Sequence, residues 1–245
     1  MMVVMQKIGG TAEIFQNTLK VANVLVEETP FSLTTDELTF KIMDPSHVAM
    51  VNLHLNKDGF KTWDVDGGAK FTVRNDEVTK VLGRFKATDD ITVGLNADNL
   101  SIVNGSRSFT LHLLEPISSE TPLPKLNFNT SFSIDRDKLL SIIKDIEAVA
   151  GHIKIEATAD GVVCVGKEDN QATISLDKDT VYDLNVKEAS AGLFNIEFLS
   201  KFVSASKADR LKVEFSSKMP LKITANIADA SYVEWYLAPR IEDSS

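Results

Sequence analysis

The chain has 245 residues, of which 43% are apolar and 25% are charged. This length provides for one large domain or for two of about 120 residues each. The formal net charge is −9, whereas proteins that bind nucleic acid by neutralising phosphates are usually basic. No apolar run reaches the roughly 18 residues that a membrane span needs, and residues 1–10 lack the pattern of a secretion signal. The sequence therefore predicts a soluble intracellular protein that contacts DNA, if at all, through a local basic surface.

The residues that usually carry catalysis or bind metals do not form a predicted site. The single cysteine, Cys164, lies between two valines, as a buried core thiol does. No glycine-rich loop has the spacing that binds phosphate. None of the histidines pairs with another, or with the cysteine, at metal-ligand spacing; they are His47, His54, His112 and His152. We therefore expect no catalytic residues, no metal ion and no cofactor.

Four segments have the periodicity of amphipathic helices. In the first, Phe15, Leu19 and Ala22 recur at helical spacing after Thr11, a plausible N-cap. Asp135 has the same role before the third helix. The predicted helices are 11–27, 75–86, 135–149 and 195–206.

Most of the remaining chain alternates apolar and polar residues with a period of two. The clearest segments are 108–113, 172–176 and 221–227. Such alternation is typical of antiparallel sheets with one buried face. Asp58-Gly59 and Asp160-Gly161 separate strands as turns.

The order of these elements repeats. A shift of 124 residues lays 11–25 onto 135–149, with Lys20 over Lys144. A shift of 123 lays Leu114-Glu-Pro116 onto Leu237-Ala-Pro239. We therefore predict an α+β fold of two tandem similar domains, each an antiparallel β-sheet with two helices. The predicted parts are an N-terminal domain at 1–114, an extended proline-containing connector at 115–127 and a C-terminal domain at 128–245.

Basic residues lie in the middle of the predicted helices or near their ends. Each alone is explained by an ordinary solvated surface, because cations are favoured near helix C-termini. The repeat of Lys20 in Lys144 favours a shared function, since corresponding helix faces would then point to one side of an assembly. The candidate DNA-facing residues are Lys20, Lys80, Arg84, Lys144, Lys201 and Lys207.

Two segments resemble the proliferating cell nuclear antigen (PCNA) family. They are 38–55, LTFKIMDPSHVAMVNLHL, and 236–242, YLAPRIE, and the similarity extends over essentially the whole chain. The resemblance, which is to archaeal members, implies the DNA clamp fold, with three chains closing head to tail into a trimeric ring whose helices line the hole. It implies a DNA sliding clamp, a processivity factor that encircles duplex DNA without reading its sequence and is not an enzyme.

The resemblance also implies that chains meet by pairing strand 107–114 of one chain with strand 171–178 of the next. Either segment could instead be an ordinary interior strand. The implied interface residues are Arg107, Phe109, Thr110, Leu111, Gln171, Thr173, Ile174 and Ser175.

A pocket beneath the connector is the family's second site, and it receives short motifs that contain glutamine and paired aromatic residues. The implied partners are DNA polymerase, the clamp loader, a flap nuclease and DNA ligase. Taken singly, Met43, Met50 and Leu123 are more typical of plain core residues, and their grouping into a pocket is implied by the resemblance alone. The matching positions are Met43, His47, Val48, Met50, Leu123, Leu126, Pro220, Tyr236, Ala238, Pro239 and Arg240.

Several alternatives remain open at this stage. A checkpoint-type or divergent clamp subunit would act mainly as a repair scaffold, and a β-rich enzyme would have an unrecognised site. The chain could form a homotrimer or join two paralogues. Lys125 stands where archaeal relatives have an acidic residue, so partner choice could differ. We expect the cytoplasm of an archaeal cell, near the nucleoid, or the nucleus of a eukaryotic one.

Overall fold

The computed structural model describes residues 6–116, 122–227 and 229–240. Contacts divide the chain into two compact units. Unit 1 contains Met1–Asp44, Val51–Thr121 and Ile227–Val233, and unit 2 contains Pro45–Met50, Pro122–Asn226 and Glu234–Ser245. In the described part of the chain, no helix is long and apolar enough to cross a membrane. The predicted boundaries at 114 and 128 remain a prediction.

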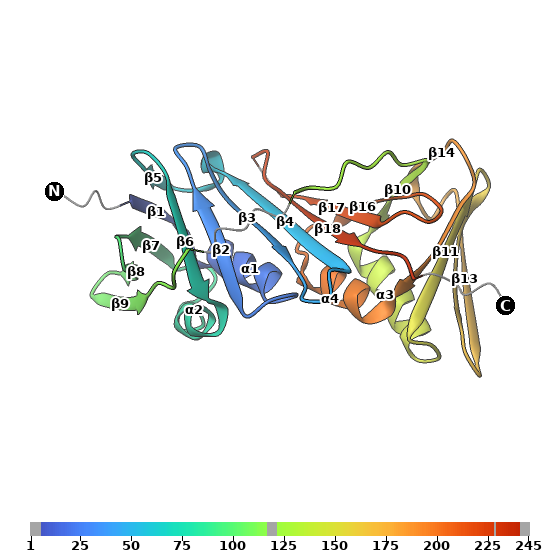
Figure 1. The fold of residues 1–245 in the computed structure, drawn as a ribbon, viewed down its shortest axis with the longest axis horizontal. Coiled ribbons are helices and arrows are strands. Elements are labelled where there is room, and N and C mark those ends of the chain that lie inside the picture. The colour runs from blue at the N-terminus through green and yellow to red at the C-terminus, as the bar shows by residue number, and fades with distance from the viewer. Residues whose placement is uncertain (1–5, 117–121, 228, 241–245) are drawn as a thin grey trace. The chain divides into compact units, whose positions relative to one another are not determined.

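Unit 1 contains two helices, α1 (Ala12–Ala22) and α2 (Asn75–Leu82), which contact each other (Figure 1). Its strands form two antiparallel arrays, in the orders β5-β1-β7-β8-β9 and β4-β3-β2-β6. A short 3-10 helix, η1 (Lys57–Gly59), follows β4. The strands are β1 (Gln6–Thr11), β2 (Glu28–Leu33), β3 (Glu37–Met43), β4 (Ala49–Asn56), β5 (Thr62–Asp64), β6 (Ala69–Arg74), β7 (Asp90–Leu95), β8 (Asn99–Asn104) and β9 (Arg107–His112).

Unit 2 has the same construction. Its helices, α3 (Arg136–Glu147) and α4 (Ile196–Ala205), also contact each other. Its strand orders are β14-β10-β16-β17-β18 and β13-β12-β11-β15. The strands are β10 (Thr130–Asp135), β11 (His152–Thr158), β12 (Gly161–Lys167), β13 (Gln171–Asp177), β14 (Tyr182–Val186), β15 (Ser190–Asn195), β16 (Arg210–Phe215), β17 (Leu221–Asn226) and β18 (Tyr232–Leu237).

The two strand orders correspond strand for strand, with β1 matching β10, β4 matching β13 and β9 matching β18. The elements β1, α1 and β3 of unit 1 begin 124 residues before β10, α3 and β12, which is the predicted shift. The α+β class, the two similar copies and the four helices are therefore confirmed. Strands β4 and β18 each contribute residues to both units.

The first two helices are shorter than predicted. The second ends at Leu82 rather than at residue 86, and the first ends at Ala22 rather than at residue 27, although Leu25 and Val26 continue the apolar pattern. The backbone tightens there, because the N–H groups of Val24 and Leu25 bond carbonyls three residues back. The carbonyls of Val26 and Glu27 accept hydrogen bonds from Asn75 at the start of α2. Residues 24–27 thus hold the second helix instead of extending the first.

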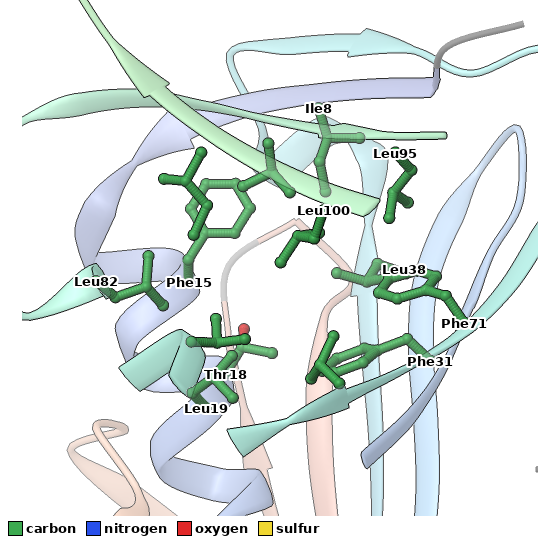
Figure 2. A pocket seen from close by; sticks show the side chains of 14 residues that line it. Ile8, Phe15, Thr18, Leu19, Phe31, Leu38, Phe71, Leu82, Leu95 and Leu100 are labelled. Atoms are coloured by element: carbon green, nitrogen blue, oxygen red, sulfur yellow. The ribbon is translucent and has the colours of Figure 1, made fainter. Parts of the chain in front are cut away.

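The core of unit 1 contains a cavity of about 50 Å³. Its lining comes from both helices and from strands of both arrays (Figure 2). Thr18 supplies the single hydroxyl, which donates to the Ile14 carbonyl at 2.8 Å, and the other lining side chains are apolar. The corresponding core of unit 2 contains only about 10 Å³. Unit 1 is therefore the less densely packed copy.

We expect Val93→Ile to stabilise unit 1, because the added methylene enters the cavity that Val93 lines. The gain should be about 1 kcal/mol, measured by denaturant unfolding. The matched control is Val213→Ile, which changes the corresponding valine of unit 2 beside the smaller void. That variant should be neutral or destabilised by overpacking. Equal stabilisation by both substitutions would contradict the difference in packing.

Candidate docking site and sheet edges

The loop between β3 and β4 is longer than its counterpart in the other copy. It spans residues 44–48, whereas residues 168–170 connect β12 to β13 and close with a bond from Glu168 N–H to the Asn170 carbonyl. His47 has a φ of 60°, in the left-handed region that few non-glycine residues adopt. Since the other copy folds without this conformation, the fold does not require it, and such strain often marks a functional segment.

The end of β18 is bonded to this loop within unit 2. The Ala238 N–H donates to the Val48 carbonyl at 2.8 Å, and the Arg240 N–H donates to the Leu193 carbonyl at 2.7 Å. Tyr236 is buried immediately before this segment, while Ala238 and Pro239 are half-buried. The structure thus brings together the two sequence segments that carried the resemblance. We propose a docking site made of loop 44–48, segment 236–240, Pro220 and the connector residues Leu123 and Leu126, and call this set the docking site.

Exposed apolar side chains support this location. Among the described residues, four large hydrophobic side chains are exposed: Val48, Leu123, Tyr182 and Ile227. Two of them, Val48 at 37% and Leu123 at 40%, belong to the docking site. Apolar groups that remain in water are candidates for partner contact.

The other predicted pocket residues differ in their accessibility. Leu126 and Pro220 are half-buried, and Met43 is half-buried in unit 1. Met50 is only 5% exposed, so its side chain supports the surface from below rather than forming it. The cavities found inside the two cores contain none of these residues.

Arg240 is held against its own unit. Its Nη1 lies 2.7 Å from His152 Nε2. Burial and the charge of Arg240 lower the pKa of His152 below its ordinary 6.5, and Glu168 opposes the shift. A neutral imidazole can accept the guanidinium hydrogen bond, whereas a protonated one would repel it.

The six predicted DNA-facing residues are all exposed. Two are paired along their own helices, Lys80 with Asp76 at 2.8 Å and Lys201 with Glu197 at 2.6 Å. The hydrogen bond between Lys80 and Asp76 raises the pKa of the lysine and lowers that of the carboxyl. The four helices together carry six basic and seven acidic residues. Their surface is therefore nearly neutral rather than strongly basic.

Strands β9 and β13 are uncovered sheet edges in the described chain. The other outer strands are short, irregular or covered. Strand β5 has three residues, and β14 contains Asp183 at a φ of 53°. Leu114 N–H bonds the Thr72 carbonyl of β6, and Arg240 N–H bonds β15 at Leu193. Only β9 and β13 combine regular pairing on one side with a free edge on the other.

The inward side chains of these two edges are incompletely buried. Phe109 and Leu111 of β9 are half-buried, whereas Trp235 and Leu237 of the matching strand β18 are fully buried. Ile174 of β13 is likewise half-buried, and the matching strand β4 contains the fully buried Val51 and Leu53.

The remaining predicted interface residues are polar. Thr110, Gln171, Thr173 and Ser175 are exposed. Arg107 is already bonded within its own unit, because its guanidinium lies 4.5 Å from the Phe85 ring centroid and donates to the Arg84 carbonyl at 3.1 Å. Sequence reasoning did not identify the charged residues Glu214, Lys222 and Glu234, which adjoin the docking site through Tyr236. Their alternation with apolar residues is that of any solvated strand face.

The fold and these surfaces define a two-copy clamp-type chain with one docking site and two free edges. The chain belongs to the proliferating cell nuclear antigen family: the family's N-terminal domain matches residues 6–107 and its C-terminal domain matches residues 122–240.

Similar sequences and similar solved structures are consistent with this family. Proteins named DNA polymerase sliding clamp from Cenarchaeum symbiosum and Nitrosopumilus maritimus are each 31% identical, covering 91% of this chain and 93% of theirs. The fold is similar to that of A. fulgidus PCNA in the structure "C-terminal region of FEN-1 bound to A. fulgidus PCNA", with a TM-score of 0.91 at 20% identity over 98% of this chain and 100% of that one. PCNA from Thermococcus kodakaraensis gives a TM-score of 0.89 at 19% identity, over 96% and 100% of the two chains.

We expect the Arg240→Met variant to raise the pKa of His152, because the repelling cation is removed. Proton titration by NMR should give a wild-type pKa below about 6.5. Since the folded chain favours the neutral imidazole, its contribution to stability is present above that pH and is lost as the pH falls. An unchanged titration curve in the variant would show that Arg240 does not reach His152 in solution. Lys167→Met, at the end of β12, is the charge-matched control.

Proposed function

We propose that the chain is a subunit of a DNA sliding clamp, in which three copies close head to tail around duplex DNA. The ring holds DNA polymerase and other replication and repair enzymes on the template and catalyses no reaction itself. This proposal draws on the relatives named DNA polymerase sliding clamp and on the two free sheet edges. We propose the cytoplasm as its location, because relatives of this sequence are archaeal.

The internal repeat supports head-to-tail assembly. Strand β18 is the copy of β9, and β4 is the copy of β13. Residues at or beside the ends of β4 and β18 are bonded inside each unit, by Asn56 N–H to Ser231 Oγ in unit 1 and by Ala238 N–H to the Val48 carbonyl in unit 2. The free strands β9 and β13 can therefore pair between chains as their copies do within one. A contact between two different edges generates a closed ring when the rotation per chain divides a full turn.

Charge favours pairing of β9 with β13 over pairing of either edge with itself, and one chain supplies both edges. Strand β9 carries Arg107 and adjoins Arg84, whereas segment 168–179, which contains β13, has four carboxylates and one lysine. Opposite charges at the two edges suppress pairing of an edge with itself. We therefore propose a homotrimer.

Twelve helices at about 10 Å each would make a circle of roughly 120 Å, and hence a diameter near 38 Å between helix axes. Duplex DNA fits inside with a layer of water. Because the helices are nearly neutral, contact with phosphates would be weak and screened by salt. Closure of the ring, rather than affinity, would retain the clamp and permit sliding.

At the docking site we propose that short motifs with a glutamine and paired aromatic residues bind, as carried by polymerases, clamp loaders, flap nucleases and ligases. In a solved structure of similar fold, the C-terminal region of FEN-1 is bound to A. fulgidus PCNA. The exposed Val48 and Leu123 would be covered by the partner's apolar side chains.

The edge-pairing proposal predicts a specific pattern of masses by light scattering. Wild type should be a trimer of the 26.9 kDa chain. Leu111→Arg and Ile174→Arg, each with one damaged edge, should be monomers. Mixed one to one, they should form a dimer through the two intact edges, because the damaged edges prevent closure. Val48→Arg, in the docking site, should remain a trimer. A wild-type monomer would contradict the homotrimer, and a mixture that stays monomeric would contradict pairing of these edges.

The docking proposal predicts that Leu123→Asp weakens binding of a glutamine–aromatic peptide at least roughly tenfold, because a carboxylate replaces an apolar contact. The mass of the assembly should not change. Ile227→Asp is the matched control, since Ile227 is exposed at 46% but lies outside the docking site. Equal peptide affinity of the Leu123 variant and wild type would place the docking site elsewhere.

The DNA-facing proposal predicts impaired loading and polymerase stimulation on primed circular DNA when Lys20, Lys80 and Lys144 are all changed to glutamate. Reversing three lysines outside α1–α4, Lys57, Lys61 and Lys187, makes the same change of net charge and should have little effect. If both triple variants behave alike, the helix lysines have no special role.

A further inference from the structure

A continuous row of polar groups crosses β16, β17 and β18 on the face away from the core of unit 2. Lys212 Nζ lies 2.7 Å from one oxygen of Glu214, whose other oxygen lies 3.6 Å from Lys222 Nζ. Lys222 Nζ also lies 2.7 Å from Glu234. The second oxygen of Glu234 accepts a hydrogen bond of 2.9 Å from the Tyr236 hydroxyl. The row therefore connects surface charges to a residue of the docking site.

The central charges of this row are largely removed from water. The side chains of Lys222, Glu214 and Glu234 are 20%, 16% and 14% exposed. Burial alone would lower the pKa of Lys222, but its hydrogen bonds and charge interactions with Glu234 and Glu214 outweigh burial and raise the pKa. Lys222 thus remains charged and holds both carboxylates in place.

The row is absent from the other copy. Glu214 and Lys222 are paired across β16 and β17, and the corresponding pair across β7 and β8 is Gly94 and Ser101. At the position that corresponds to Lys212, unit 1 has Thr92. Since unit 1 forms the same strand order without these charges, the fold does not require them. They occur only in the copy whose last strand leads into the docking site.

Tyr236 connects the row of charged residues to the docking site. It is 8% exposed, and two residues later Ala238 bonds the Val48 carbonyl. The hydrogen bond that the Tyr236 hydroxyl donates to Glu234 restrains the orientation of the ring. A ring with a fixed orientation reduces the ordering that a partner must impose on binding.

We propose that Glu234 is a positioning residue of the docking site, which fixes the Tyr236 ring through its hydroxyl while Lys222 holds the Glu234 carboxylate, so that an apolar partner segment meets a preformed wall. This inference rests on the proposed function of the docking site.

The test is a double-mutant cycle with Glu234→Ala and Tyr236→Phe, measuring the affinity of a synthetic peptide with one glutamine and two adjacent aromatic residues by calorimetry. Each single variant should bind roughly three- to tenfold more weakly. In the Tyr236→Phe background, Glu234→Ala should cause no further loss, because the bond through which Glu234 acts is already gone. Undiminished affinity of Glu234→Ala, or the same loss in both backgrounds, would overturn the proposal.

The Glu234→Gln variant distinguishes an effect of Glu234 on peptide binding from an effect on the stability of the fold. Its amide oxygen can still accept the Tyr236 hydroxyl bond, but it no longer neutralises Lys222. Peptide affinity should recover toward wild type while the unfolding temperature stays low. Parallel loss of affinity and stability in Glu234→Ala and Glu234→Gln would show a purely structural role. If wild type itself does not bind the peptide, the proposed docking function fails, whereas wild-type binding with an additive cycle overturns only the role of Glu234.

Discussion

An edge strand exposes a row of N–H and C=O groups that must be paired, covered or hidden from other chains. The outer strands of this chain are shortened, as β5 is, or bonded by a neighbouring segment, as Leu114 bonds Thr72 of β6. Among the described residues, strands β9 and β13 are neither shortened nor bonded along their outer edge. They are regular, and their apolar side chains are left half-buried. We propose that these two edges make the isolated chain a subunit, because a ring that pairs β9 of one chain with β13 of the next would satisfy both.

The internal repeat separates features that the fold needs from features that it does not. Corresponding strands occupy corresponding positions in both copies, so the sheet orders and the helix pairs belong to the scaffold. Each of three features occurs in only one of the two copies. The long loop 44–48 with the strained His47 follows β3 of the first copy, and the charged row ending at Tyr236 lies on β16, β17 and β18 of the second. All three features adjoin the docking site. Comparison of the two copies thus shows which features the fold itself does not require.

The sequence predicted the four helices and the two-copy repeat because amphipathic periodicity and element order are local signals. It overextended the first helix, since the hydrogen bonds that take up residues 24–27 come from Asn75, which is distant in sequence. Strand β4 buries five residues in succession, Ala49–Leu53, so period-two reasoning could not decide the exposure of Met50. Lys222 and Glu234 gave no signal, because a charge on a polar strand position is ordinary until its partners on other strands are known. The basic and acidic residues of the helices can be counted in the sequence, but the count depends on where each helix ends, which the structure provides.

The most direct test of edge pairing is amide hydrogen exchange of β9 and β13 as a function of protein concentration. At concentrations where chains associate, the outward N–H groups of 107–112 and 171–177 should exchange slowly, and on dilution below the dissociation constant both should become fast together. Strands β8 and β12, which are paired on both sides within one chain, should not change. Exchange at β9 and β13 that is fast at every concentration, or that responds in one strand but not in the other, would contradict the account.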